Sequence, residues 1–346
     1  MWTLAFLKTF QLRFLGKFLI SLPLKDVKHR EFLRLKVMEP EELKEKYVGA
    51  QCVMVTPFKE DFSVDEDGLK LVTDFLIENG VHVLQPTGST GEFFSLTPEE
   101  HKRVIKIVVE EVGGRVPVVP GTSHSGTKMT IEMSKYAESV GADGVMIVPP
   151  YYQLPTLEGI YEHYKAVAES IKIGIVVYNN PWTSKITIGP ELMRKLAEIP
   201  NIVAVKETTR NMTLALRLLN KLGDRLTFSM GSGEELAPFY YMCGAKGHVT
   251  AIANFAPKFA VGMYEAAMRK DWDEVMKIHS KLTPYFELNH RLGEKNKGTM
   301  YISMTKEAMK MLGLPGWPPR KPLLPLHDDE REELRKVLID MELIKS

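Results

Sequence analysis

The stretch that decides the fold runs from Gly174-Ile175-Val176-Val177-Tyr178 to Ile202-Val203-Ala204-Val205-Lys206-Glu207. Both apolar runs have the length of a strand and are rich in Val and Ile, as in parallel strands that are buried on both faces. Residues 189–198 between them have the pattern of a helix. The stretch therefore predicts a unit of strand, helix and parallel strand.

The same alternation extends along the chain in both directions. Strand-length apolar runs lie at residues 51–55, 81–85, 116–119, 144–148, 174–178, 202–206, 226–230 and 247–252. Helix-start signals follow several of them, and Thr97-Pro98-Glu99-Glu100 is a capping box with proline at the first helical position. Eight strands, each followed by a helix, predict a (β/α)8 TIM barrel, and a doubly wound sheet is the runner-up.

Three regions are expected from these patterns. The barrel should occupy residues 48–270, and residues 271–346 should form a C-terminal helical extension. Residues 1–47 read as an N-terminal extension, in which basic and large apolar side chains alternate up to residue 36. Such a segment is either a basic amphipathic or transit segment, or the product of an over-long gene start, with the true start near Met38.

The bulk composition excludes several classes of function. The 45 basic and 44 acidic side chains leave a net charge of +1, which gives no overall attraction to nucleic acid. No apolar run is long enough to span a membrane. Cys52 and Cys243 are too few for a disulfide framework or a zinc site, so we expect a cytoplasmic protein with no metal and no cofactor.

The chemistry of a barrel lies at the carboxyl ends of its strands. Lys206 ends a buried apolar strand, where desolvation lowers the pKa of an ammonium group and frees a nucleophilic amine. Such an amine forms imines with carbonyl compounds. The alternative is that Lys206 pairs with Glu207 or another nearby acid at the rim.

Two further clusters follow strand ends. Gly88-Ser89-Thr90-Gly91-Glu92 offers backbone N–H groups and two hydroxyls, which suit a carboxylate, although a tight turn with a helix cap would read the same way. Tyr178 ends its strand as either a proton shuttle or a core residue. Gly231-Ser232-Gly233 lacks the third glycine of a dinucleotide fingerprint and reads as a loop of close approach.

Taken together, these stretches resemble the dihydrodipicolinate synthase and N-acetylneuraminate lyase family of class I pyruvate-dependent aldolases, over residues 48–341. The matching text is Val55-Thr56-Pro57-Phe58, Gly88-Ser89-Thr90-Gly91-Glu92, Pro150-Tyr151-Tyr152, Tyr178-Asn179-Asn180-Pro181, Val205-Lys206-Glu207 and Gly231-Ser232-Gly233. Each motif is weak alone, and their order and spacing make them specific in combination.

The resemblance implies a role for several residues. Lys206 would form the imine with a 2-oxo acid, and Tyr178 would relay protons to and from the bound intermediate. Ser89 and Thr90 would bind the substrate carboxylate within the cradle of Gly88 and Gly91, and Thr90 would bridge to Tyr178.

Other implied positions lie around this centre. Tyr152 would reach into the site of a neighbouring subunit, so the resemblance implies a homo-oligomer, often a homotetramer built as a dimer of dimers. Val249 matches a position whose backbone carbonyl faces the site, and Gly231 lies in a loop at the same mouth. His124 follows the third strand, where it would contact a distal hydroxyl or simply lie on the surface.

The chain also departs from the pattern of true dihydrodipicolinate synthases. They carry an arginine five residues after the relay tyrosine, which holds a second carboxylate, and here that position is Thr183. Threonine cannot form a charge-assisted bidentate pair, and the loss should cost about 2 kcal/mol or more of substrate binding.

Two other relatives share local features. The continuation Phe93-Phe94-Ser95-Leu96-Thr97-Pro98 resembles 5-dehydro-4-deoxyglucarate dehydratases. Lys185 resembles a residue of hydratase-aldolases that cleave benzylidenepyruvates, in which case Trp182 would stack on an aryl group. The plainer interpretation places Trp182 and Lys185 on the rim as ordinary surface residues.

We therefore predict a Schiff-base lyase, aldolase or dehydratase that acts on pyruvate or another 2-oxo acid, together with an aldehyde. The alternative within the family is 4-hydroxy-tetrahydrodipicolinate synthase of lysine biosynthesis, disfavoured by Thr183. Rivals from other classes are a barrel that binds a 2-oxo acid without turnover and a metal-dependent aldolase, the latter disfavoured because no His, Asp and Glu cluster appears at the strand ends.

Overall fold

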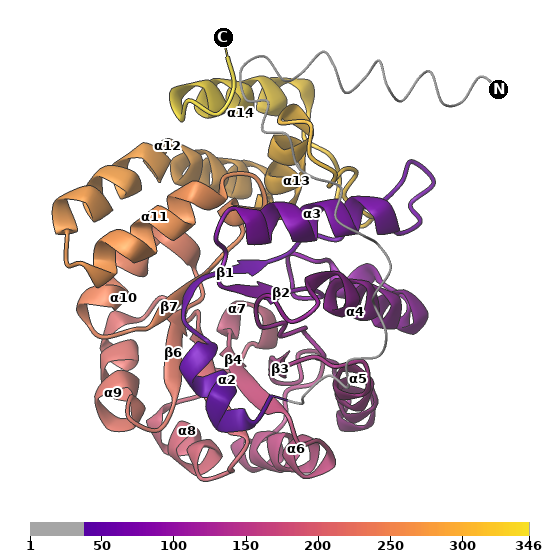
Figure 1. The fold of residues 1–346 in the computed structure, drawn as a ribbon, viewed down its shortest axis with the longest axis vertical. Helices are drawn as coiled ribbons and strands as arrows, with labels where there is room; N and C mark the ends of the chain where they lie inside the picture. The colour runs from indigo at the N-terminus through magenta and orange to yellow at the C-terminus, as the bar shows by residue number, and fades with distance from the viewer. Residues whose placement is uncertain (1–37, 346) are drawn as a thin grey trace. The chain divides into compact units, whose positions relative to one another are not determined.

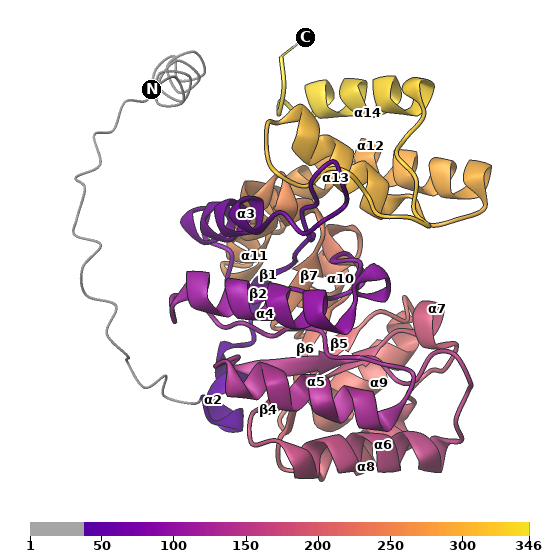
Figure 2. The same ribbon diagram turned by 90° about the vertical axis from the view of Figure 1, so that its right-hand side faces the viewer.

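A computed structural model describes residues 38–345 of the chain (Figures 1 and 2). The expectations for residues 1–37 lie outside the described residues. The first described helix is α2 (Pro40–Lys46), with proline in its first turn, acidic residues at its start and lysines at its end. This arrangement complements the helix dipole.

A parallel sheet forms the centre of the fold (Figure 1). Its seven strands are β1 (Gly49–Val53), β2 (Val83–Gln85), β3 (Gly144–Ile147), β4 (Gly174–Asn179), β5 (Ile202–Glu207), β6 (Thr227–Met230) and β7 (Gly247–Thr250). They lie in the order β2-β1-β7-β6-β5-β4-β3, and every neighbouring pair is parallel. Their burial on both faces explains the continuous Val and Ile runs.

The third predicted strand, residues 116–119, is not a regular strand, which corrects that part of the prediction. The segment instead makes isolated parallel bridges, from Val118 to Leu84 of β2 and from Gly121 to Met146 of β3. Pro117 and Pro120 each remove a backbone donor, so a full ladder cannot form on both sides. The segment still occupies the gap between β2 and β3, and the architecture is the expected (β/α)8 barrel.

Helices follow the strands around the outside (Figure 1). They are α3 (Glu66–Glu78), α4 (Pro98–Val112), α5 (Thr127–Ser139), α6 (Leu157–Ser170), α7 (Pro181–Ser184), α8 (Pro190–Ala197), α9 (Met212–Leu222), α10 (Ala237–Met242) and α11 (Pro257–Met268), with short 3-10 turns η1 (Phe93–Ser95), η2 (Gly233–Glu235) and η3 (Ile252–Asn254). The predicted capping box is present: the Thr97 hydroxyl accepts from the Glu100 backbone, and the Glu100 carboxylate accepts from the Thr97 backbone.

Helix α2 closes the end of the barrel at which the strands begin. Leu43 and Tyr47 are fully buried and pack with Val176 and other strand residues in one apolar cluster. Leu43 approaches β3 and β4 so closely that a Cβ at Gly144 or Gly174 would lie 2.3 or 2.7 Å from its Cδ2 atom. Figure 2 shows α2 and α7 at opposite ends of the barrel, so the carboxyl ends of the strands lie on the side away from α2.

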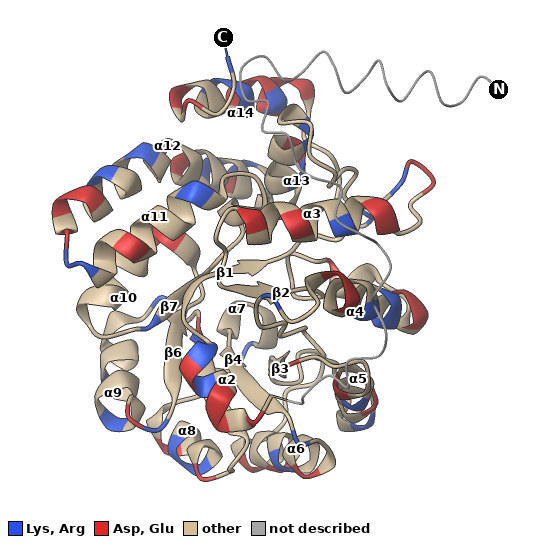
Figure 3. Cartoon of the chain, in the orientation of Figure 1, with Lys and Arg blue, Asp and Glu red and all other residues tan. Residues whose placement is uncertain are grey.

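The C-terminal part is helical, as predicted. It consists of α12 (Trp272–Asn296), α13 (Tyr301–Met311) and α14 (Asp328–Asp340), with the proline-rich break at residues 314–319 between the last two. Within residues 38–345, no helix is both long and apolar enough to cross a membrane. Figure 3 shows acidic and basic residues interspersed along the outer helices, while the strands carry few of either.

Candidate active site

Lys206 and Tyr178 lie side by side at the carboxyl ends of β5 and β4. They are register partners in the parallel pairing of the two strands. The Lys206 Nζ atom lies 4.1 Å from the centre of the Tyr178 ring. The sequence predicted both residues as site candidates, and the tertiary structure brings them into direct contact.

The Lys206 amine is held in an apolar environment. The residue is 3 % exposed, and burial lowers its pKa to about 7. No neighbouring charge contributes to that pKa shift, which means that desolvation alone favours the neutral amine. A large part of the Lys206 population is therefore nucleophilic at neutral pH.

Glu207 does not neutralise Lys206, although it is the next residue. Successive side chains of a strand point to opposite faces, and the Glu207 carboxylate accepts from Asn179 Nδ2 and the Thr209 backbone N–H, each at 2.8 Å. Burial raises the pKa of Glu207, and these donors partly offset that effect. The contacts of Glu207 thus argue against the interpretation of Lys206 as one half of a rim ion pair.

Tyr178 has polar neighbours at its hydroxyl. Asn180 Nδ2 donates to the Tyr178 oxygen at 2.9 Å. Burial raises the pKa of Tyr178, and contacts with Asn180, Ser89 and Thr208 act in the opposite direction. The phenol therefore stays protonated at neutral pH, with an oxygen that can pass a proton on. Asn180 belongs to one of the motifs that carry the family resemblance, but the sequence did not predict a role for it.

The loop after β2, in which the sequence predicts a carboxylate-binding site, has a compact backbone. It is bounded by Thr87 and Glu92, two non-glycine residues with left-handed φ values of 56° and 54°. A Cβ at Gly91 would lie 3.0 Å from the Met54 carbonyl oxygen and the Thr87 backbone nitrogen, so the fold leaves no room for a side chain there. At Gly88 a Cβ would lie 2.8 Å from Val53.

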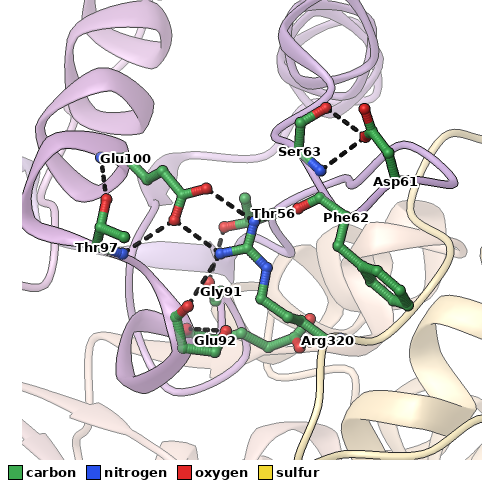
Figure 4. Close-up of polar contacts among 10 residues, drawn as sticks. Thr56, Asp61, Phe62, Ser63, Gly91, Glu92, Thr97, Glu100 and Arg320 are labelled. Carbon is green, nitrogen blue, oxygen red and sulfur yellow. Dashed lines mark hydrogen bonds and ion pairs between the residues drawn. The ribbon is translucent and has the colours of Figure 1, made fainter.

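Residues from distant parts of the chain hold the loop after β2 in its strained backbone conformation (Figure 4). The Thr56 hydroxyl donates to the Gly91 carbonyl at 2.7 Å. Glu92 is completely buried, and its carboxylate pairs with Lys306 Nζ at 2.5 Å and accepts from the Arg320 backbone N–H at 2.7 Å. Burial lowers the pKa of Lys306 to about 8, and Glu92 counteracts the shift. The strained backbone of this loop is thus stabilised by contacts with the C-terminal region.

Arg320 links the same region to the start of α4 (Figure 4). Its guanidinium donates to both carboxylate oxygens of Glu100, at 2.7 and 2.9 Å, and to the backbone carbonyls of Ser95 and Phe62. Its Cζ atom also lies 4.1 Å from the centre of the Phe58 ring. The sequence pattern did not single out Lys306 and Arg320, because their partners on the barrel lie more than 200 positions away.

The bridge from Thr90 to Tyr178 that the resemblance implies stays a prediction. Thr90 is buried in the loop, and Ser89 is among the groups that act to lower the pKa of Tyr178. Burial raises the pKa of Tyr301, the first residue of α13, and Thr90 acts in the opposite direction.

Two other predicted positions lie at neighbouring strand ends. Gly231 directly follows β6, and its N–H donates to the Glu207 carbonyl at 2.7 Å. A Cβ there would lie 1.9 Å from the Thr208 hydroxyl, so the position is one of close approach, as predicted. Val249 lies buried on β7.

Thr183 lies in α7, directly after β4. Its hydroxyl accepts from Asn180 Nδ2 at 3.0 Å, so the same amide contacts Thr183 and Tyr178. Trp182 is 66 % exposed, and Lys185 Nζ donates to the Trp182 carbonyl at 2.8 Å, as expected of rim residues. The position of the missing arginine is therefore occupied by a neutral hydroxyl.

His124 and Tyr152 are exposed. The Nδ1 atom of His124 accepts from the Gly126 backbone N–H at 3.0 Å. Tyr152, in the loop after β3, is 80 % exposed and does not contribute to the contacts around Lys206. In the part of the chain that the structure describes, no three His, Cys, Asp or Glu side chains gather as metal ligands would.

Comparisons with known proteins agree with this geometry. The profile of the dihydrodipicolinate synthetase family matches residues 46–341. A protein of Archaeoglobus fulgidus named 4-hydroxy-tetrahydrodipicolinate synthase is 37% identical over 303 residues, which cover 86% of this chain and 99% of that protein. One of the same name from Methanococcus vannielii is 40% identical, with the same coverage. The crystal structure of dihydrodipicolinate synthase from Aquifex aeolicus superposes with a TM-score of 0.80 at 33% identity, over 86% of this chain and 100% of that one. The chain therefore belongs to the dihydrodipicolinate synthetase family and is a class I lyase of that family.

Proposed function

We propose that this protein condenses or cleaves a 2-oxo acid such as pyruvate and an aldehyde through an imine on Lys206. The observation that carries the proposal is the isolated, buried amine of Lys206, which lies beside the Tyr178 ring. Burial lowers the pKa of this amine to about 7. A neutral amine is what attack on a carbonyl carbon requires. Family membership supports the same chemistry.

The proposed reaction uses the groups in turn. The carboxylate of the 2-oxo acid binds the backbone N–H groups and hydroxyls of the 88–91 loop. Lys206 attacks the ketone carbon, and the carbinolamine loses water to leave a protonated imine. The imine withdraws electrons from the adjacent C–H bond, whose proton leaves by way of Tyr178, and the resulting enamine carbon attacks the aldehyde. Cleavage is the reverse sequence.

Two different aldehydes are candidates for the second substrate, and each implies a different reaction. The names of relatives that are 37 to 40% identical favour 4-hydroxy-tetrahydrodipicolinate synthesis, which would make aspartate semialdehyde the aldehyde. Thr183 argues against this assignment, because its neutral hydroxyl cannot replace a guanidinium that holds a second carboxylate. A neutral or aromatic aldehyde would not need that charge, and Trp182 offers it an exposed ring.

Reductive trapping tests the imine. The protein is incubated with pyruvate, reduced with borohydride and mapped by peptide mass, and the adduct is expected on Lys206. Lys206→Met should remove the adduct, and Lys185→Met, which alters an exposed lysine, should retain it. Absence of an adduct on the wild-type protein would reject the lyase and favour a barrel that binds a 2-oxo acid without turnover. Binding of pyruvate to such a barrel would be detected as an increase in its thermal stability.

An aldehyde panel then separates the specific reactions. Aspartate semialdehyde, an aryl aldehyde and a sugar-acid substrate are compared by kcat/KM under identical conditions. Efficient turnover of aspartate semialdehyde would establish the activity of the named relatives and overturn the argument from Thr183. Preference for the aryl aldehyde would support the neutral distal site.

We also propose a homo-oligomer. Large apolar side chains are exposed on the loop after β3, at the start of α6 and on α7, namely Tyr152, Leu154, Leu157 and Trp182. Exposed apolar side chains of this size are typical of interfaces. A second copy of the chain is the proposed occupant. Sedimentation should show a species larger than the monomer, and Tyr152→Asp should shift it toward the monomer.

A further inference from the structure

Helix α2 is fitted closely to the floor of the barrel, which is the end at which the strands begin. The Leu43 side chain occupies space that glycines at the starts of β3 and β4 leave open, since a Cβ at Gly144 or Gly174 would lie 2.3 or 2.7 Å from its Cδ2 atom. At the start of β6, the Thr227 hydroxyl donates to the Lys44 carbonyl at 2.7 Å. The helix therefore contacts three strands at the floor.

The interior around Lys206 is lined by small side chains of the strands. Ala204 precedes Lys206 by two positions and so faces the same side of β5. Ser229 is the register partner of Lys206 on β6, and Gly247 is the register partner of Ser229 on β7. Barrel interiors are usually filled by bulky branched side chains of the strands. Three neighbouring strands therefore leave space that other side chains must fill.

Tyr47 and two glutamines occupy this interior. Tyr47 is the C-cap residue of α2 and is fully buried, and Gln85 Nε2 donates to its hydroxyl at 2.7 Å. Gln51 Nε2 donates to the Tyr47 carbonyl at 3.2 Å and to Ser229 Oγ at 2.8 Å. The same amide packs against bare backbone, since a Cβ at Gly247 would lie 2.7 Å from Gln51 Nε2. A continuous set of contacts thus runs from α2 to β6 inside the barrel.

The apolar contacts of the helix lead toward the same site. Leu43, Tyr47, Ala204 and Tyr178 belong to one cluster of buried apolar side chains. The Tyr178 ring in turn lies 4.1 Å from Lys206 Nζ. The closure of the floor and the surroundings of the amine are therefore parts of one packed interior.

The amine of Lys206 depends on this interior being dry. Burial alone lowers its pKa to about 7, and the Glu207 carboxylate lies on the opposite face of β5. The Tyr47 phenol stays neutral as well, because burial raises its pKa. The floor thus acts on the amine by excluding water rather than by adding a charge. Water entering through the floor would solvate the ammonium form and raise the pKa of Lys206.

We propose that Leu43 and Tyr47 are positioning residues that close the floor of the barrel and keep water away from the Lys206 amine, so that it stays a neutral nucleophile. The inference rests on the proposed function, since it assumes that this amine attacks the 2-oxo acid. No covalent bond forms or breaks at either residue. Apart from Lys46, α2 precedes the residues that match the family profile, so the helix is a feature that the family match does not include.

The test measures the pH midpoint of reductive trapping with pyruvate. Tyr47→Ala removes the ring and leaves a space lined by the amides of Gln51 and Gln85, which water can fill. We expect the midpoint to move upward by about one pH unit, which slows trapping near neutral pH about tenfold, while the alkaline plateau stays within about twofold of the wild type. Tyr47→Phe keeps the ring and should leave the midpoint near its wild-type value.

Leu43 provides a second set of variants for the case in which Tyr47→Ala does not fold. Leu43→Ala, and the milder Leu43→Val, open the floor and should raise the midpoint, the second by less. Because a Cβ at Gly174 would overlap Leu43 Cδ2, adding Gly174→Ala to Leu43→Ala refills part of the opening and should lower the midpoint again. Leu334→Ala on α14 is the matched control: it truncates a fully buried leucine outside the barrel and should lower thermal stability without moving the midpoint.

A purely structural role would lower the plateau or the thermal stability and leave the midpoint in place. Wild-type midpoints in the folded Tyr47 and Leu43 variants would therefore overturn the inference. This outcome is separable from that of the proposed function. Absence of a pyruvate adduct on wild-type Lys206 rejects the function, whereas a normal adduct with unmoved midpoints in the variants rejects only the role of the floor.

Discussion

The amine of Lys206 lies 4.1 Å from the centre of the Tyr178 ring, and the two residues are register partners on neighbouring parallel strands. This pairing places an uncompensated buried amine beside a buried phenol. Both groups are kept in their neutral forms by desolvation: the pKa of Lys206 is lowered to about 7, and the pKa of Tyr178 is raised.

The first prediction concerns the pH dependence of imine formation. Because only the neutral amine attacks, the rate of reductive trapping of pyruvate should fall about tenfold for each pH unit below about 7 and level off above it. Single-turnover trapping between mildly acidic and alkaline pH, with circular dichroism to verify the fold, measures this. A midpoint near that of an ordinary exposed lysine would contradict the isolated, buried amine.

The second prediction concerns stability. Since the folded state lowers the pKa of Lys206, the unfolded chain binds more protons between about 7 and the usual lysine value. Stability of the wild type should therefore rise with pH through this window. Lys206→Met should raise the free energy of unfolding at neutral pH, and it should make the increase of stability with pH smaller. Urea titrations of both proteins at neutral and alkaline pH provide the comparison, and parallel pH profiles would argue against the depressed pKa.

The third prediction concerns the pair of Lys306 and Glu92. Lys306→Met leaves the Glu92 carboxylate buried without its cation, which should cost about 3 to 5 kcal/mol of stability. Adding Glu92→Gln removes the uncompensated charge and should recover a large part of the loss. Chemical denaturation of the two variants measures the difference. A double variant as unstable as Lys306→Met would show that the charge imbalance is not the cause.

The fourth prediction concerns Thr183. Thr183→Arg places a guanidinium beside the Asn180 contact, where it can pair with a distal carboxylate. The gain for aspartate semialdehyde should be about 2 kcal/mol, or roughly thirtyfold in kcat/KM, with little gain for a neutral aldehyde. Thr183→Gln is the control for side-chain size. If wild-type turnover of aspartate semialdehyde is already high and Thr183→Arg adds nothing, another group binds that carboxylate.

Local pattern was enough to predict the barrel. Val- and Ile-rich runs and the capping box at Thr97 depend on neighbours in the chain, and the structure confirms the elements they indicate. Lys206 and Tyr178 could be placed at one end of the barrel because parallel strands share a direction. The irregular segment at 116–119 is an exception with a local cause, since Pro117 and Pro120 limit its ladder.

The sequence by itself determined the order of strands and helices, the identity of the strand-end residues and the family resemblance. Only the tertiary structure decided which groups meet: Asn180 with Tyr178, and Lys306 and the backbone N–H of Arg320 with Glu92. The last two contacts join residues more than 200 positions apart. Periodicity and capping record only interactions within a few residues, whereas these two contacts depend on how α13 and the segment after it pack on the barrel, which no local pattern encodes.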